Sequence, residues 1–316
     1  MKQSFSMFKK LITEEVWKIK EDTLEVILKE MTKNNGTVHS ALEFREQGEV
    51  VSVLIYLTPY FEDYNAGFSL EELAQDIYSS YQENKKHGRI FESGIWCNDY
   101  ETVPDKVIYK LINYEQNKKL LEEIPHIRLC DLAIIFCLLV ERSRDYLSTA
   151  VIHKEHMASW GMDTQTLMEL ADKNTKRLLP AKIRNISDVM KEIASNYVGD
   201  DSKKSVLEDM LSTPGDISLY VLSNHMSRNG AIAMAYEGML KDFATELDHD
   251  LIILPSSIHE VLLVPYEEEL CMEELKEMVR HVNRTEVAKE EVLSDNVYIY
   301  RRKTDKISIA GEQLEE

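Results

Sequence analysis

The residues of this chain that could carry out chemistry together lie in one short polar segment between two apolar runs. Residues 250–265 read DLIILPSSIHEVLLVP, so Ser256 or Ser257 could supply a nucleophile and His259 its base. Such a pair works only when hydroxyl and imidazole approach to about 2.6–3.2 Å and a third group orients the ring. Glu260 is a poor third group, because neighbouring residues of an extended segment point to opposite faces.

The same segment can also be interpreted as a turn. A proline ends the first apolar run, serine hydroxyls hydrogen-bond a turning backbone, and no G-x-S-x-G elbow surrounds either serine. We therefore expect these side chains to satisfy backbone groups. The candidate catalytic residues are Ser256, Ser257, His259 and Glu260.

Two histidines form the candidate metal site. His153 and His156 lie three residues apart and could share one face of a helix. The HExxH pattern of zinc enzymes needs histidines four residues apart, so this spacing does not match it. We expect instead the polar start of a helix after a strand that ends at Ile152, with no metal and no cofactor.

A polar loop between a predicted strand and a predicted helix holds the candidate ligand-binding residues. Residues 224–230 read NHMSRNG, with Asn224, Arg228 and Asn229 as candidates. Backbone N–H groups at the start of a helix attract anions. One glycine falls short of any phosphate-binding pattern, however, and capping of the helix by Asn229 or Ser227 explains the same residues.

Charge and composition limit the classes of partner. The 316 residues carry 56 acidic against 37 basic side chains, a net charge of −19 that disfavours nucleic-acid backbones and anionic membranes. Acidic side chains could imitate a nucleic acid only if they line one face at phosphate-like intervals. With 44% hydrophobic residues the chain can form a sizeable core.

Cysteine usage and hydropathy indicate a cytoplasmic protein. Cys97, Cys130, Cys137 and Cys271 show no CxxC spacing and are typical of reduced residues. The run LCDLAIIFCLLV is too short for a membrane helix, which needs about 20 apolar residues. The N-terminus is too charged for a secretory signal.

Strands and helices alternate along the chain and must position these candidates. The pattern predicts a helix over 5–33, a hairpin around Gln47-Gly48, and a helix that opens with a capping box formed by Ser69 and Glu72. The order strand, strand, helix then recurs twice. It is predicted at 131–140, 146–152 and a helix capped by Asp163, and at 251–254, 261–264 and a helix over 271–282.

The fold class that follows is α+β, with mixed or antiparallel sheets and helices packed on one face. The last third is predicted to run βαββαββ, close to a split βαβ arrangement, with its first helix over 230–247. We expect an N-terminal α+β region over 1–198, a linker over 199–216, a C-terminal α+β domain over 217–310 and a frayed tail over 311–316.

Four stretches of the chain resemble a bacterial family that is frequent in gut clostridia and catalogued as a domain of unknown function. They are KLINYEQNKKLLEEIPH, LYVLSNHMSRNGAIAMAYEGMLKDFA, DLIILPSSIHEVLLVP and EEVLSDNVYIYRR. The resemblance runs from about Val38 to Arg302. It implies a cytoplasmic bacterial protein, and it supplies no activity, cofactor or catalytic residue.

These patterns favour a non-enzymatic protein that binds or regulates a protein partner, because no catalytic set stands at working spacing. The alternative is a hydrolase or metal-dependent enzyme whose site joins His259 and Glu260 with distant residues such as Asn224 or His153. A third hypothesis is an acidic nucleic-acid mimic. No membrane and no direct nucleic-acid binding are expected.

Overall fold

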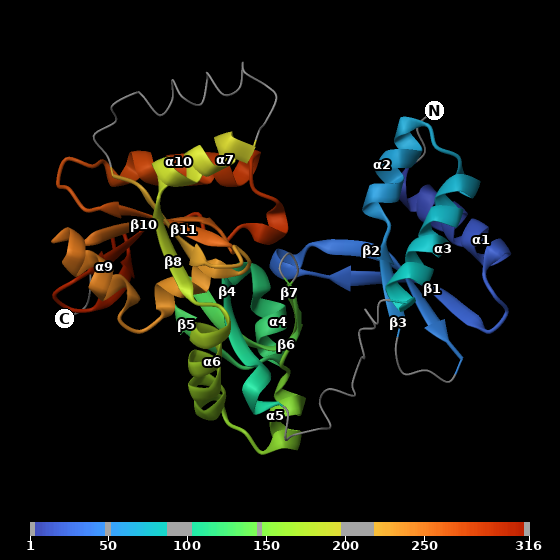
Figure 1. Cartoon of the computed structure of the whole chain (residues 1–316), viewed down its shortest axis with the longest axis horizontal. Helices are drawn as coiled ribbons and strands as arrows, with labels where there is room; N and C mark the ends of the chain where they lie inside the picture. The colour runs from blue at the N-terminus through green and yellow to red at the C-terminus, as the bar shows by residue number, and fades with distance from the viewer. Residues whose placement is uncertain (1–3, 48–51, 87–102, 144–146, 197–217, 313–316) are drawn as a thin grey trace. The chain divides into compact units, whose positions relative to one another are not determined.

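A computed structural model describes residues 4–47, 52–86, 103–143, 147–196 and 218–312 (Figure 1). The chain divides into two compact units, Met1–Glu101 and Thr102–Glu316. Helices accompany three antiparallel sheets, which confirms the α+β class. The expected linker over 199–216 lies outside the described residues. A strand that precedes it, 181–185, pairs with one that follows it, 220–224.

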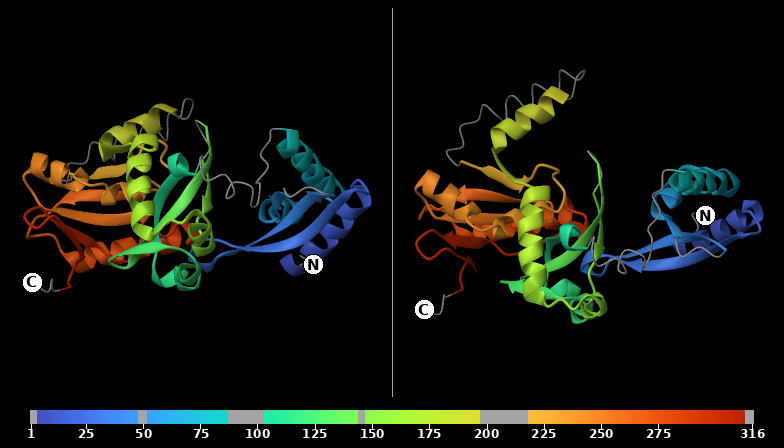
Figure 2. Two further views of the ribbon diagram at one scale, coloured as in Figure 1. Left: turned by 90° about the horizontal axis from the view of Figure 1, so that it is seen from below. Right: turned by 60° about the horizontal axis from the view of Figure 1, so that its bottom comes forward.

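The first unit packs helices against a three-stranded sheet (blue to teal in Figures 1 and 2). Its elements are α1 (Phe5–Ile19), β1 (Leu24–Thr32), β2 (Val38–Glu46), β3 (Ser52–Tyr56), α2 (Thr58–Ala66) and α3 (Leu70–Lys86). The strand order is β1-β2-β3. One stripe of each long helix packs with alternate strand residues in the core, among them Phe8, Ile12, Phe44 and Ile77.

The helix predicted over 5–33 is only partly correct, because α1 ends at Ile19 and β1 follows. The spacing of Leu24, Leu28 and Met31 fits a helical stripe. The buried Leu24 and Val26 also alternate with exposed neighbours, however, and this is the period of a strand. Residues 24–32 pair along their whole length with β2, and this pairing makes them a strand and not a helix.

Local signals elsewhere in the first unit are confirmed. β2 and β3 form the predicted antiparallel hairpin. At the start of α3 the Glu72 N–H donates to Ser69 Oγ at 3.2 Å, and the Ser69 N–H donates to Glu72 Oε2 at 2.9 Å. These reciprocal bonds satisfy two backbone donors at the helix start and form the predicted capping box.

The second unit contains two sheets, of which the smaller has four strands. They are β4 (Val107–Asn113), β5 (His126–Leu129), β6 (Leu132–Arg142) and β7 (Leu147–Val151). β6 pairs with the other three, and the strands predicted at 131–140 and 146–152 are confirmed as β6 and β7. The accompanying helices are α4 (Lys118–Glu123), α5 (Lys154–Trp160) and α6 (Thr164–Leu178). α6 is capped by Asp163 as predicted.

The larger sheet has six strands in the order β13-β12-β10-β11-β9-β8. They are β8 (Ala181–Asn185), β9 (Tyr220–Asn224), β10 (Leu251–Ser257), β11 (Glu260–Pro265), β12 (Tyr298–Arg301) and β13 (Lys306–Ile309). The helices around it are α7 (Ile186–Asn196), α9 (Met239–Leu247) and α10 (Met272–Thr285), with 3-10 segments η5 (Gly230–Ala235) and η6 (Lys289–Glu291). From β9 onward the order follows the predicted βαββαββ.

The helix predicted over 230–247 is divided into η5 and α9. Gly238 lies between them with φ of 81°, a left-handed conformation that a helix interior does not contain. This break turns η5 against β9 and β11, while α10 packs over Ile252 and Val264 through Val279. Within the described residues, no helix is both long and apolar enough to cross a membrane.

Candidate functional site

The backbone of the turn between β10 and β11 is hydrogen-bonded to three separate segments. The Ala231 N–H of η5 donates to the Ile258 carbonyl at 3.3 Å, and the Ile258 N–H donates to the Glu291 carbonyl at 2.8 Å. The Ser223 hydroxyl of β9 donates to the His259 carbonyl at 2.7 Å. The turn therefore connects segments that lie far apart in the sequence.

Neither candidate serine forms a hydrogen bond with the imidazole of His259. Ser257 Oγ accepts the backbone N–H of His259 at 3.0 Å, and Ser257 is itself buried. Ser256 and Glu260 are half-buried and have no side-chain hydrogen bond within the described part of the chain. The hydroxyl of Ser257 thus satisfies the turning backbone, in the way serines commonly do at turns.

Both nitrogens of the His259 ring are engaged. Nδ1 accepts the backbone N–H of Asn229 at 3.1 Å, and Nε2 lies 3.1 Å from Glu291 Oε1. Because Nδ1 is an acceptor here, a neutral ring carries its proton on Nε2 and donates it to the glutamate. His259 and Glu291 resemble a base and its orienting acid, but no ring nitrogen remains to accept a proton from a nucleophile.

The loop that follows β9 is organised by one buried amide side chain. Asn224 Oδ1 accepts the N–H groups of Met226 and Arg228, at 2.9 and 3.4 Å, and its Nδ2 donates to the Arg228 carbonyl at 2.8 Å. Asn229 adopts a left-handed conformation and makes no side-chain cap, so its predicted capping role is wrong. Its N–H instead bonds to His259.

A glycine permits this close approach. A Cβ atom on Gly230 would lie 2.1 Å from Ser223 Oγ and 2.6 Å from both the Asn224 N and the His259 O. No side chain fits there, so η5 can pack against the β10–β11 turn only with glycine at this position. One catalytic candidate, His259, therefore meets the loop that holds the ligand-binding candidates Asn224 and Asn229. We call this arrangement the His259 junction, and it is made of Ser223, Asn224, Asn229, Gly230, His259 and Glu291.

The two candidate metal ligands lie at the start of α5, as the sequence predicted. The His153 N–H donates to Nδ1 of His156 at 3.0 Å, so this ring nitrogen caps the helix. His156 stacks on Trp160, and burial is the main cause of its lowered pKa, followed by the neighbouring His153. Across the described residues, no group of three or more His, Cys, Asp or Glu side chains is arranged to hold a metal ion.

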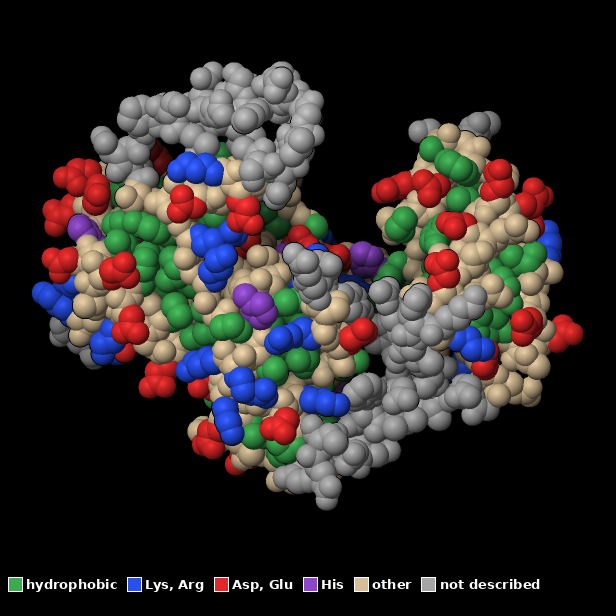
Figure 3. Space-filling view, in the orientation of Figure 1, with side chains coloured by type: hydrophobic (Ala, Val, Ile, Leu, Met, Phe, Trp, Pro, Cys, Tyr) green, Lys and Arg blue, Asp and Glu red, His purple; other side chains and the backbone are tan. Residues whose placement is uncertain are grey.

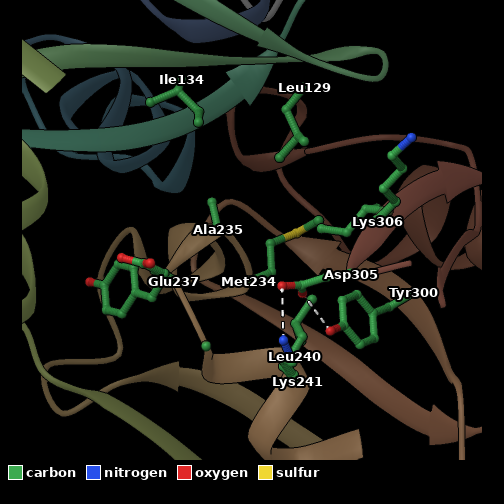
Figure 4. Close-up of a pocket in the computed structure, with 13 residues that line it drawn as sticks. Leu129, Ile134, Met234, Ala235, Glu237, Leu240, Lys241, Tyr300, Asp305 and Lys306 are labelled. Carbon is green, nitrogen blue, oxygen red and sulfur yellow. Dashed lines mark hydrogen bonds and ion pairs between the residues drawn. The ribbon is translucent and has the colours of Figure 1, made fainter. Parts of the chain in front are cut away.

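A cavity of about 480 Å³ lies within the second unit (Figure 4). Leu129 of β5 and Ile134 of β6 form one side of it, and Met234 and Ala235 of η5 face them. Leu240 of α9 adds to this apolar lining. The volume falls in the range of about 300–1,000 Å³ that is usual for small-molecule sites.

Charged and hydroxyl groups surround this apolar lining. They are Glu237 before α9, Lys241 on α9, Tyr300 on β12, and Asp305 and Lys306 at the β12–β13 turn. The Tyr300 hydroxyl donates to Asp305 Oδ1 at 2.6 Å, and Lys241 Nζ lies 3.7 Å from Asp305 Oδ2. Burial raises the pKa of Tyr300 above its usual range, and its bond to Asp305 raises it further.

The two sheets that border the cavity are joined by one carboxylate. Asp131, at the β5–β6 turn, accepts hydrogen bonds from the Tyr298 hydroxyl at 2.6 Å, the Ser294 hydroxyl at 2.7 Å and the Asn296 amide at 3.0 Å. Bonds to an ionised acceptor are the stronger kind. They fix the β5–β6 turn against β12, the strand that brings Tyr300 to the cavity.

Sequence reasoning missed the cavity, because its lining comes from segments far apart in the chain. Leu129 and Lys306 line the same space although they belong to different sheets. The one available signal was the apolar stripe of the helix expected over 230–247, which supplies Leu240, but a stripe does not show what faces it.

Charge is also distributed unevenly on the visible face, where Lys and Arg gather around α6 (Figure 3).

The fold and the site define an α+β protein with a hydrogen-bonded packing junction and a separate ligand-sized cavity. The chain belongs to the family of unknown function DUF5688, whose model matches residues 5–302. This match confirms the resemblance to a domain of unknown function over nearly the whole chain. Neither the curated proteins nor the solved structures contain a match to this chain.

Proposed function

We propose that this protein is a non-enzymatic binding protein and that its ligand lies in the 480 Å³ cavity. The observation that carries the proposal is the combination of an apolar interior with charged groups at its border. A site of this composition can bury the body of a small molecule and orient it by a few polar contacts. A cytoplasmic location and a regulatory role for the bound ligand remain part of this proposal.

The contacts of the candidate catalytic residues support a binding role over a hydrolytic one. Both ring nitrogens of His259 are occupied, and Ser257 serves the backbone. Among the described residues, His153 forms no hydrogen bond with His259, and no group of three or more His, Cys, Asp or Glu side chains could hold a metal ion, which disfavours the alternative of a hydrolase or metal-dependent enzyme. The cavity, in contrast, keeps charged side chains available to a ligand.

Binding to the cavity can be tested with three simple aromatic probes. Phenethylamine, 3-phenylpropionate and phenethyl alcohol share one apolar body and differ in charge, and saturation-transfer NMR reports their contact with the protein. We expect at least one probe to bind the native chain, and Ala235→Trp to abolish that binding by filling the cavity. The matched control is Ala288→Trp, at an exposed position outside the cavity.

Two outcomes would contradict the proposal. One is that none of the three probes contacts the native protein at millimolar concentration. The other is that a probe binds equally well to Ala235→Trp, provided that circular dichroism shows this variant to be folded.

A further inference from the structure

The loop between β9 and η5, residues 225–229, contains two residues in a left-handed backbone conformation. Ser227 has φ of 50° and Asn229 has φ of 51°. Glycine adopts this conformation freely and asparagine tolerates it, but a serine is held there against the steric preference of its Cβ atom. Strained residues of this kind persist only where the surrounding contacts fix them. The contacts of this loop therefore determine whether it keeps its conformation.

The two ends of the loop are fixed by hydrogen bonds of different kinds. At the first end the His225 N–H donates to the Pro180 carbonyl at 3.1 Å, and the Asn224 side chain bonds to the backbone of the loop. At the last end the Asn229 N–H donates to Nδ1 of His259 at 3.1 Å. A carbonyl or amide oxygen accepts at every pH of interest, whereas an imidazole nitrogen accepts only while it carries no proton.

A second proton on the His259 ring excludes its contact with Asn229. The Glu291 carboxylate, 3.1 Å from Nε2, accepts hydrogen bonds and donates none, so Nε2 carries the proton of the neutral ring. A further proton can then attach only to Nδ1. The Nδ1–H and the Asn229 N–H would both be donors, and two donors form no hydrogen bond. The imidazolium therefore keeps Glu291 and loses Asn229.

Glu291 is the charged group bonded to the ring, and it favours the second proton. Its side chain is 41% exposed, and its negative charge attracts the imidazolium. β10 and η5 carry no titratable side chain. The titratable side chains of the other segments around the turn are those of Tyr220 on β9, His225 and Arg228 in the loop, Glu260 on β11, and Lys289, Glu290 and Glu291 on η6. Protonation thus exchanges the Asn229 bond for a stronger ion pair with Glu291.

We propose that His259 is a pH-sensitive switch that holds the 225–229 loop at neutral pH and releases it in acid. Histidine is the side chain that ordinarily gains its charge between pH 8 and pH 5. The His259 side chain is 20% exposed, so water has access to the ring. Once the Asn229 bond is lost, the strain at Ser227 favours another conformation of the loop. The loop does not line the cavity, and the inference does not depend on the proposed binding function.

Amide hydrogen exchange of the full chain, measured residue by residue by NMR, tests the switch. Protection of the Asn229 N–H, relative to its exchange rate in an unfolded peptide at the same pH, should fall about tenfold or more between pH 8 and pH 5. The Ala231 N–H is the internal control, because it donates at 3.3 Å to the Ile258 carbonyl of the same turn, which does not titrate. Its protection should stay constant. Equal losses at Asn229 and Ala231 would overturn the inference, because acid would then open the whole junction.

Two variants connect the transition to the ring. His259→Gln removes the titratable nitrogen, so protection of the Asn229 N–H should change less than about twofold over the same pH range. Glu291→Gln removes the charge that favours the imidazolium, so the pH midpoint of the Asn229 transition should decrease by about half a unit. The matched control is Glu246→Gln, the same change at an exposed position on α9, which should leave the midpoint in place.

Two further results would overturn the inference. One is Asn229 protection that does not change with pH in the native chain. The other is a pH dependence that persists in His259→Gln, because another group would then control the loop. If circular dichroism shows that His259→Gln does not fold, Glu291→Gln decides, and an unchanged midpoint in that variant contradicts the switch.

Discussion

The backbone N–H of Asn229 donates to Nδ1 of His259 across 3.1 Å, although the two residues are 30 positions apart. This bond fixes the tautomer of the ring and leaves the other nitrogen to Glu291. The imidazole therefore acts as an acceptor for a backbone group in the interior of the unit. Removal of the imidazole should therefore lower the free energy of unfolding.

We expect His259→Ala to lower the free energy of unfolding by about 1–3 kcal/mol, because the Asn229 N–H loses its acceptor in a poorly solvated place. The His259 side chain is only 20% exposed, so water replaces it incompletely. Urea unfolding followed by circular dichroism measures the change. His281→Ala, at an exposed position on α10, is the control and should stay within about 0.5 kcal/mol of the native value. A similarly small effect of His259→Ala would contradict the structural role.

How far the sequence predicted this arrangement depends on the range of the interactions. Signals within a few residues were sufficient for the capping box at Ser69, the cap at Asp163 and the hairpins. Periodicity did not predict the structure of Leu24–Thr32, because the same apolar residues fit both a helix and a strand. These residues form a strand because they pair with β2. The cavity needs side chains from two sheets, and no local pattern carries that information.

The candidate site illustrates the same limit. The sequence identified His259, Asn224 and Asn229, and it favoured a structural role for the turn. It did not identify Glu291 as the partner of His259 or Gly230 as the residue that lets η5 approach. Both contacts depend on long-range packing, and a lone glutamate in an acidic chain carries no signal of its own.

A side chain at position 230 should strongly destabilise the second unit. In Gly230→Ala the new Cβ would meet Ser223 Oγ at 2.1 Å and two backbone atoms at 2.6 Å, so η5 must move away from the β10–β11 turn. We expect a loss of about 3 kcal/mol or more. Thermal unfolding by calorimetry reports this loss.

Gly161→Ala separates crowding from backbone conformation. Gly161 has φ of 64° and no atom within 4 Å of an added Cβ. Its substitution should therefore lower the free energy of unfolding only by the cost of placing alanine in a left-handed backbone conformation, about 1–2 kcal/mol. Equal losses in the two variants would show that position 230 is not crowded.

The capping box at α3 should make a measurable contribution to the first unit. Ser69→Ala removes the acceptor of the Glu72 N–H, and we expect it to lower the free energy of unfolding by about 0.5–2 kcal/mol. Ser79→Ala changes the same residue type at an exposed position inside the helix, where alanine is the better helix former, so stability should rise slightly. Urea unfolding compares the two variants. Equal effects would mean that the cap does not stabilise the helix.

The Tyr298–Asp131 bond should make stability depend on pH in the alkaline range. Burial raises the pKa of Tyr298 well above its usual value of 10, and the Asp131 carboxylate raises it further. Above pH 10 the unfolded chain loses this proton while the folded chain keeps it. The stability linked to Tyr298 is therefore complete below pH 10 and declines as the pH rises.

One such group contributes a slope of about 1.4 kcal/mol per pH unit. We expect Tyr298→Phe to be less stable than the native chain at pH 7 by about 1.5–3 kcal/mol, because it loses a hydrogen bond to a charged acceptor. Between pH 10 and 11.5, its stability should decline less steeply than that of the native chain by about this slope. Phe136→Leu, which weakens the buried core without removing an ionisable group, should shift the curve without changing its steepness. Parallel curves for Tyr298→Phe and the native protein would show that Tyr298 titrates alike in the folded and unfolded chain.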